Sequence, residues 1–433
     1  MNTGKRHYAW TIVAALMVLT FVMGYSSSYA IFMVPVSNAF GTTTTAFGLT
    51  YTILTYCEVL GAPICAKLYK KYDGRIIITT GIVMTGLCYL LQGFCTAMWQ
   101  LYVLNAIQGL FAGILVLQLN SEVLSHWFAI NIATIIGVAS CLRGIGGAVW
   151  NGLGGWLIDI VGWRPTFIIF GAAIMIIGVP FCLLLRKDPI EKGLKPYGIE
   201  KVDPATYNED PMKKPGMMLK AMYKQPAFWI FTITIGVATF CNVLYGYLNA
   251  FLQTERGLTS TTAGLCNSAL MIGGAIFYIV IGRVFDKSPK LATIMCYAGS
   301  IIAYPVLIYT KNMSYLGFLI CFFLIGTTYQ PTGGILYPAM TRDLGGDKDF
   351  TMFWALEISV LNFTGALGST GWGLCLQALG YEATFTLCAA LYAASVVAFI
   401  AAMAIGRKKW RKLPEWQPGV GVEESAKAKE ATA

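Results

Sequence analysis

Long apolar stretches, separated by short groups of charged, glycine or proline residues, recur along the whole chain. Twelve of them are long enough to cross a bilayer, since a membrane-spanning helix needs about 20 predominantly apolar residues. The fold class that this pattern predicts is an all-α membrane protein with twelve transmembrane helices. The predicted spans are residues 8–34, 45–68, 75–95, 99–125, 131–159, 163–185, 226–252, 260–285, 290–310, 314–340, 349–376 and 380–406.

The longest polar stretch lies between the sixth and seventh spans and contains nine Lys or Arg and six Asp or Glu residues. This stretch divides the chain into two halves with six predicted spans each. The predicted parts are an N-terminal six-helix bundle (1–185), a cytoplasmic central loop (186–225), a C-terminal six-helix bundle (226–406) and a cytoplasmic tail (407–433).

The positive charges are distributed very unevenly between the two sides of the predicted membrane. Of the 31 Lys and Arg residues, 27 lie on the side of the N-terminus, the central loop and the tail, and three lie on the other side. One more, Arg143, lies within a span. Because cytoplasmic loops carry an excess of Lys and Arg, both termini are predicted to be cytoplasmic, in a multi-pass protein of the cell membrane.

Composition excludes several other classes of protein. Of the 433 residues, 56% are apolar and 12% are charged, about half the charged share of a soluble domain. The net charge of +10 is spread between apolar segments, so no nucleic-acid partner is expected. Two histidines, twelve cysteines in apolar stretches and the absence of HExxH and GxxxxGK[ST] motifs predict no metal site, no cofactor and no enzyme activity.

Two pairs of segments repeat at nearly the same distance along the chain. The sequence GWRPTF at 162–167 returns as GYEATF at 380–385, and AKLYKK at 66–71 returns as GRVFDK at 282–287. The offsets of 218 and 216 residues indicate a tandem duplication of a six-helix unit. Parallel repeats of this kind place a substrate cavity near the membrane midplane between the halves.

With these motifs the chain resembles the major facilitator superfamily over residues 8–406. The segment 282–287 looks like the cytoplasmic-loop motif of that family, Gly-x-x-x-Asp-Arg/Lys, whereas the first-half copy departs from it at Lys70 and Asp73. Within the superfamily, the first span at 24–35 and the run MFWAL at 352–356 look like carriers of the monocarboxylate and oxalate:formate group.

The resemblance implies a secondary-active transporter of a small, monocarboxylate-like organic anion that works by alternating access, as a monomer, by proton symport or exchange. In the oxalate:formate carriers a lysine and an arginine hold the dicarboxylate. The matching positions here are Glu357 and Tyr278, which disfavours oxalate itself.

Three ionisable residues lie within predicted spans, where such side chains are costly and are functional candidates: Glu58, Arg143 and Glu357. Arg143 and Glu357 are predicted to bind substrate, and Glu58 and Glu357 to couple transport to protons. The alternative for Glu58 and Arg143 is a structural ion pair. A further alternative is a zwitterionic or cationic solute held by Glu58 and Glu357, because glutamates outnumber arginine here.

Polar and aromatic residues of the first and seventh spans are predicted to complete the substrate site. Tyr25 and Tyr29 lie on neighbouring faces of one helix, while Asn242, Tyr245 and Asn249 recur at i, i+3 and i+7 on the other. Charged residues at the cytoplasmic ends predict gates formed by Lys70, Lys71 and Glu122 in the first half and by Arg283, Asp286 and Lys287 in the second. The sequence leaves open the substrate, the coupling ion and the direction of transport.

Overall fold

The computed structural model describes residues 8–116, 123–124, 126–130, 132–186, 188–201, 216–310, 312–413 and 416. The structure is almost entirely helical, and within these residues the β pairing consists of two isolated bridges, Phe128 with Tyr197 and Gly216 with Gly346. The first half of the chain forms α1 (Ala9–Met23), α2 (Met33–Phe40), α3 (Thr44–Lys71), α4 (Gly74–Gln92), α5 (Met98–Val116), α7 (Ile132–Val161) and α8 (Trp163–Leu184).

The second half repeats this order of helices. Its elements are the short α10 (Leu219–Met222), then α11 (Pro226–Asn242), α12 (Leu248–Thr254), α13 (Ser260–Lys287), α14 (Pro289–Tyr309), α15 (Tyr315–Pro331), α16 (Tyr337–Gly345) and α17 (Phe350–Lys409). Eight helical segments of the described chain are long and apolar enough to cross a membrane, and one of them, Met352–Lys412, contains both the eleventh and the twelfth predicted spans. The second, fourth and fifth predicted spans are α3, α5 and α7.

A glycine with a positive φ divides the last two spans. Gly380 interrupts α17 with φ 73° and ψ 177°, and Gly162 stands between α7 and α8 with φ 83° and ψ 170°. Other residues are strained in this region of backbone space, so a turn of this kind requires glycine. Both glycines open the repeated sequence motif, which explains why the motif begins with the same residue in each half.

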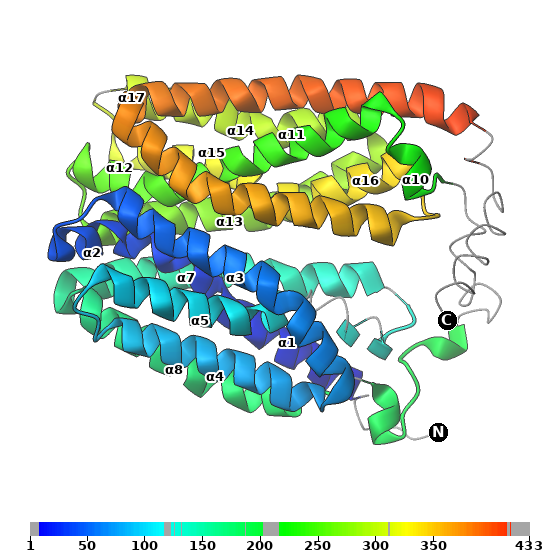
Figure 1. The fold of residues 1–433 in the computed structure, drawn as a ribbon, viewed down its shortest axis with the longest axis horizontal. Coiled ribbons are helices and arrows are strands. Elements are labelled where there is room, and N and C mark those ends of the chain that lie inside the picture. The colour runs from blue at the N-terminus through cyan, green and yellow to red at the C-terminus, as the bar shows by residue number, and fades with distance from the viewer. Residues whose placement is uncertain are drawn as a thin grey trace.

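The helices pack in the same pairs in both halves (Figure 1). In the first half α1 packs on α7, α3 on α5 and α4 on α8. In the second half α11 packs on α17, α13 on α15 and α14 on α17. The halves meet mainly through α7 against α13 and α3 against α17, so the twelve helices form two six-helix repeats. The exact domain limits at 185 and 226 stay predictions.

Three of the spans that face the interface between halves are irregular near their centres. The first contains a 3₁₀ segment, η1 (Gly24–Phe32), and the seventh contains another, η5 (Val243–Tyr247). The tenth contains a π-helical segment, η6 (Thr332–Leu336), directly after Pro331, which has no N–H to donate. The first span also continues to Phe40, beyond its predicted end at 34, because Pro35 stands in the first turn of α2, where proline is tolerated.

The two parts of the central loop that the structure describes contact different halves. Within 188–201, the Tyr197 N–H donates to Trp127 O at 2.8 Å, which holds this part on the first half. Within 216–222, the Met217 N–H donates to Gly345 O at 2.9 Å, and the Leu219 N–H donates to Asp349 Oδ2 at 2.9 Å. Each half therefore binds its own end of the loop.

Candidate functional site

Two cavities lie between the halves, next to the irregular segments. We call the end of the molecule at which α1 begins and α17 ends the terminal end, and the opposite end, formed by α2 and α12, the distal end (Figure 1). The cavity nearer the distal end is lined by residues of η1, α2, α3, η5 and α17, including Tyr29, Phe47, Tyr51, Tyr245 and Ser369.

The second, central cavity has a volume of about 210 Å³ and a lining rich in hydroxyl and amide groups. Tyr51 and Tyr245 line both cavities. The polar lining of the central cavity is completed by Thr55, Thr239, Asn242, Tyr329, Thr332, Tyr337 and Asn362.

The interface between the halves is closed on the distal side where α3 meets α17. The Ser369 hydroxyl donates to Gly48 O at 2.8 Å, and the Thr52 hydroxyl lies 2.9 Å from both Ala366 O and the Thr370 hydroxyl. The Tyr247 hydroxyl also lies against Gly48, where a Cβ would collide with it. These contacts close the distal end at one of the two main interfaces between halves.

A second set of polar contacts closes the α7–α13 interface. The Asp159 carboxylate accepts hydrogen bonds from the Ser260 N–H at 3.2 Å, the Thr261 N–H at 2.7 Å and the Thr261 hydroxyl at 2.5 Å. It therefore caps the N-terminus of α13, where a negative charge is stabilising. Nearer the centre, Asn267 Nδ2 donates to Asn151 Oδ1 at 2.7 Å.

Arg143 of α7 lies outside both cavity linings but within electrostatic range of them. Its side chain is exposed, and Nη2 lies 3.4 Å from the Ser26 hydroxyl. Its charge acts on the hydroxyl groups of Tyr51, Tyr245 and Tyr329, which form the cavity walls. Its neighbour Gly144 lies against Gln330 of α15, so this turn of α7 faces the opposite half.

Sequence comparison places this architecture in a known family. The family model described as Major Facilitator Superfamily matches residues 16–348. The chain belongs to the major facilitator superfamily. Its two six-helix repeats have the two cavities between them.

Several known proteins are similar to this superfamily member. The membrane sensor protein UhpC of Escherichia coli K12 is 23% identical over 313 residues, or 66% of each chain, so the match spans just under two thirds of that relative. The oxalate:formate antiporter of Oxalobacter formigenes is 21% identical over 380 residues, covering 85% of this chain and 86% of the antiporter. The resemblance to that group is confirmed at low identity.

A solved structure shows the same fold over nearly the whole superfamily member. A bacterial homologue of the human lysosomal transporter Spinster, crystallised in an inward-facing and unoccupied conformation, aligns with a TM-score of 0.73 at 15% identity. The alignment covers 94% of this chain and 99% of that structure. The predicted fold class is therefore confirmed.

The structure brings Arg143 and Glu58 into electrostatic range of each other without direct contact. Within the described part of the chain, no ion pair of 4.0 Å or less joins the two side chains, although the charge of Arg143 acts on Glu58. The guanidinium group is thus not occupied by a close carboxylate. Tyr25 is also near both groups and lies inside the first half, 4.9 Å from Tyr89 between ring centroids.

A buried polar chain supports the two predicted tyrosines of the first span. Asn105 Nδ2 donates to the Tyr29 hydroxyl at 3.0 Å. Gln108 Nε2 donates to the Tyr25 hydroxyl at 3.4 Å, and Gln108 Oε1 accepts from Gln92 Nε2 at 3.3 Å. The Asn105 amide positions Tyr29, which lines the distal cavity.

The predicted residues of the seventh span divide between two environments. Asn242 and Tyr245 line the central cavity, whereas Asn249 is fully buried and lines neither cavity. The 3₁₀ segment η5 begins directly after Asn242, contains Tyr245 and ends before Asn249. It changes the helical period from 3.6 to about 3.0 residues per turn. The i, i+3, i+7 pattern therefore does not keep these three side chains on one face.

Glu357 is fully buried and lies outside both cavity linings. Its Oε1 accepts a hydrogen bond from the Thr232 hydroxyl of α11 at 2.6 Å, and its Oε2 has no hydrogen-bond partner within the described part of the chain. The nearest cavity residue of α17 is Leu361, one helical turn closer to the distal end. This geometry gives Glu357 no direct path to a substrate in the central cavity.

The predicted gates are seen only in part. Lys71 is exposed at the end of α3, while the side chain of Lys70 and all of Glu122 lie outside the described residues. Arg283, Asp286 and Lys287 are exposed at the end of α13, and we find no ion pair between them and any other described residue.

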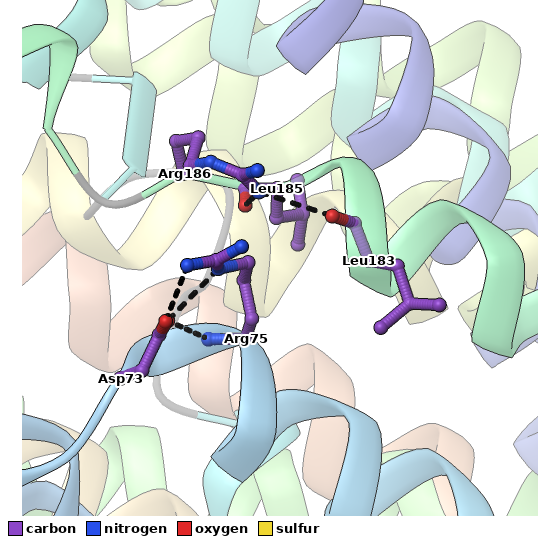
Figure 2. A network of polar contacts seen from close by, with 5 residues as sticks. All are labelled: Asp73, Arg75, Leu183, Leu185 and Arg186. Atoms are coloured by element: carbon purple, nitrogen blue, oxygen red, sulfur yellow. Dashed lines mark hydrogen bonds and ion pairs between the residues drawn. The ribbon is translucent and has the colours of Figure 1, made fainter. Parts of the chain in front are cut away.

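A different charged cluster, missed in the sequence, occupies the terminal end of the first half (Figure 2). Asp73 caps α4 through the Arg75 N–H at 3.0 Å and pairs with the Arg75 guanidinium at 2.5 Å. Arg186 donates to Leu183 O at 3.0 Å and Leu185 O at 2.8 Å, which caps the end of α8. An aspartate directly before a helix and two residues before an arginine is the signal that could have revealed the first pair.

We expect Asp73→Asn to lower the free energy of unfolding slightly, by less than about 1 kcal/mol, because the pair is partly exposed. The hydrogen bond from Arg75 lowers the pKa of Asp73. A carboxylate with a lowered pKa stabilises the fold above its unfolded pKa of about 4, and this contribution is lost as the pH falls below that value. Melting temperatures of the two proteins should therefore converge between pH 5 and pH 3; a constant difference would contradict this assignment.

Proposed function

We propose that this protein is a secondary-active transporter of a small, monocarboxylate-like organic anion across the cytoplasmic membrane by alternating access. The observation that carries the proposal is Arg143, a cation within a membrane span that lies outside both cavity linings but within electrostatic range of their wall residues Tyr51 and Tyr245. Among the described residues it has no carboxylate within 4.0 Å, and its one hydrogen bond is the long contact with Ser26. Arginine binds carboxylates through a planar fork of N–H donors, which suits this role.

The arrangement of contacts between the halves supports alternating access. Hydrogen bonds that join the described parts of the two halves involve Gly48, Thr52, Ala148, Asn151 and Asp159 on the first-half side, all from the centre to the distal end. Rocking of the halves would break these contacts and expose the same cavities at the distal end. The substrate would then reach Arg143 from alternate sides of the membrane.

Binding to the purified protein tests the charge of the substrate. We expect small monocarboxylates to raise the melting temperature in a concentration-dependent manner, because a ligand that binds only the folded state stabilises it. The corresponding neutral amides and primary amines should have no such effect. Stabilisation by the amines alone would overturn the proposal.

We propose that Glu58 and Glu357 couple transport to protons by symport or exchange. Glu357 would act from within the α11–α17 contact rather than on the substrate, since it is one helical turn beyond the central cavity. Protonation of a carboxyl that is packed between two helices changes their interaction and can thereby bias a conformational equilibrium.

We expect Glu357→Gln to retain binding but to abolish accumulation driven by a pH gradient. The amide can still accept the hydrogen bond from Thr232, so the fold should be preserved. Uptake into proteoliposomes with and without a pH gradient measures the effect, and Glu382→Gln, at an exposed position, provides a control. Full gradient-driven accumulation in Glu357→Gln would exclude this coupling role.

A zwitterionic or cationic solute is the second candidate, because Glu58 lies within electrostatic range of Arg143 and could bind an ammonium group. The two candidates differ in the sign of their pH dependence. A cation needs an ionised carboxylate, so its affinity should fall as the pH decreases, whereas an anion that binds with a proton should bind more tightly. Substrate affinity from pH 5 to pH 8 separates them.

We propose that the terminal end faces the cytoplasm and that the protein functions as a monomer. Single cysteines introduced into 186–225 should then react with a membrane-impermeant thiol reagent only after the cells are opened. Labelling of this loop in intact cells would contradict the orientation. Light scattering of the purified protein measures the oligomeric state.

A further inference from the structure

At the terminal end of α17, the outer surface of the twelfth span continues into a row of lysines. Exposed side chains of this span recur at i, i+4, i+7 and i+11, at Val397, Ala401, Ala404 and Lys408. Lys412, in η7 (Trp410–Lys412), is exposed four residues later. None of these residues lines either cavity, so the row faces the surrounding membrane. Because a charged side chain is costly in hydrocarbon, the change from alanine to lysine marks the beginning of the headgroup layer.

The arginines of the same segment point toward α16 and hold the segment in place. Arg407 Nε donates to Asp343 Oδ2 at 2.8 Å, and Arg411 Nη2 donates to Asp343 Oδ1 at 3.0 Å. The Trp410 side chain between them is fully buried. No hydrogen bond or ion pair joins another described residue to the exposed lysines of this segment, which are Lys408, Lys409 and Lys412.

A second basic segment, around α10, lies at the same end of the second half (Figure 1). The Gly216 N–H donates to Trp416 O at 3.0 Å, which joins the chain before α10 to the chain after α17. Lys220 and Lys224 are exposed, and neither makes a hydrogen bond or an ion pair with another described residue. Two separate parts of the chain therefore bring unpaired lysines to this end.

Aromatic residues show that Lys224 lies at the level of the lipid headgroups. Trp229 and Ile233 are exposed on the outer face of α11, one helical turn apart. Trp229 Nε1 donates to Tyr223 O at 2.9 Å, and the Tyr223 ring is also exposed. Trp and Tyr are enriched at the membrane–water interface, because each has an apolar ring and a polar group. Lys224 follows Tyr223 directly and so lies in the same layer.

The carboxylates at this end cannot neutralise the lysines. The segments 216–225, 342–349 and 407–413 together contain nine Lys or Arg residues and three Asp residues. All three aspartates accept hydrogen bonds, from arginine side chains or from a backbone N–H and not from these lysines. The excess of six positive charges therefore favours an anionic partner.

We propose that five exposed lysines form a binding surface for the headgroups of anionic phospholipids. We call this surface the basic patch, and its residues are Lys220, Lys224, Lys408, Lys409 and Lys412. The partner is a lipid because the patch begins where the apolar outer face of the spans ends. A zwitterionic lipid also has a phosphate, but its ammonium group offsets the attraction. This inference requires the membrane-spanning fold, and it does not depend on the substrate or on the direction of transport.

Native mass spectrometry of the purified full-length protein tests the inference, because it resolves the binding of single lipids. The probes are phosphatidylglycerol and phosphatidylcholine with the same acyl chains. A basic residue near an anionic surface strengthens binding by about fivefold, so the wild-type protein should bind phosphatidylglycerol about tenfold or more tightly than phosphatidylcholine. In Lys408→Gln/Lys412→Gln, affinity for phosphatidylglycerol should fall by about tenfold or more, and affinity for phosphatidylcholine should not change.

The control variant is Lys195→Gln/Lys290→Gln, which removes two exposed lysines of the terminal end that lie outside the basic patch. We expect it to bind phosphatidylglycerol as the wild-type protein does. Equal affinity of the wild-type protein for the two lipids would overturn the inference, and so would an equal loss in the control variant. Displacement of phosphatidylglycerol by an equal concentration of inorganic phosphate would show that the ligand is free phosphate instead. Since the wild-type ratio is decisive alone, the inference is tested even if a variant fails to fold.

Discussion

Replacement of Arg143 with lysine is expected to weaken substrate binding by about 10- to 100-fold while the protein stays folded. A lysine keeps the positive charge but cannot form the two parallel hydrogen bonds of the guanidinium group. Hydrogen bonds to charged groups contribute about 1.5–3 kcal/mol each, and 1.4 kcal/mol corresponds to a factor of ten. Because the guanidinium has one long contact, to Ser26, its loss removes little structural support.

Calorimetric titration of a carboxylate measures this effect, and melting temperature reports on folding. Arg164→Lys is a matched control, since Arg164 lies at the distal end and donates to Cys95 O at 3.2 Å. Normal binding in Arg143→Lys would contradict the assignment of Arg143 as the anion-binding residue. If Arg143→Ala loses transport and the double variant Glu58→Gln/Arg143→Ala regains it, the two residues form a structural pair.

Replacement of Asp159 with alanine is expected to shift the conformational equilibrium toward opening at the distal end. The carboxylate accepts three hydrogen bonds across the α7–α13 interface. Loss of about 1.5–3 kcal/mol from one state changes the ratio of the two conformations by about 10- to 100-fold. Asp159→Asn should have a smaller effect, because the amide oxygen can still accept.

Spin labels at Asn38 and Glu255, both exposed at the distal end, measure this shift as a change in their distance distribution. The experiment requires a background in which the twelve native cysteines are replaced. We expect a larger long-distance population in Asp159→Ala than in the parent protein. A lower melting temperature with an unchanged distance distribution would instead show that Asp159 only stabilises α13.

The fold was predictable because membrane helices leave strong local signals. Apolar length defined the spans, and the repeated motifs at 162–167 and 380–385 indicated the duplication. In the structure each motif begins with a glycine of positive φ that separates two spans. The predicted end of the first span was wrong. The span was ended just before Pro35, but Pro35 stands in the first turn of α2 and the helix continues beyond it. Local sequence does not distinguish these two positions of proline.

The site was less predictable because its geometry depends on packing. Asn249 was placed on the same helical face as Asn242 and Tyr245 by assuming a regular α-helical period, which η5 interrupts. The sequence of residues 243–247 contains no signal that predicts a 3₁₀ segment. For Glu357, the sequence identified a costly buried carboxyl but not its depth, which places it beside Thr232 and beyond the cavity. Asn362 was missed because a single asparagine in an apolar helix gives no indication of the face on which it lies.

The most direct test of the proposed function is exchange of a labelled monocarboxylate in proteoliposomes that are preloaded with the same unlabelled compound. We predict saturable accumulation of the label in vesicles with the wild-type protein and at least tenfold slower accumulation with Arg143→Lys at the same low substrate concentration. Equal accumulation in both, or accumulation only of a labelled amine, would contradict the assignment of Arg143 as the anion-binding residue of this transporter.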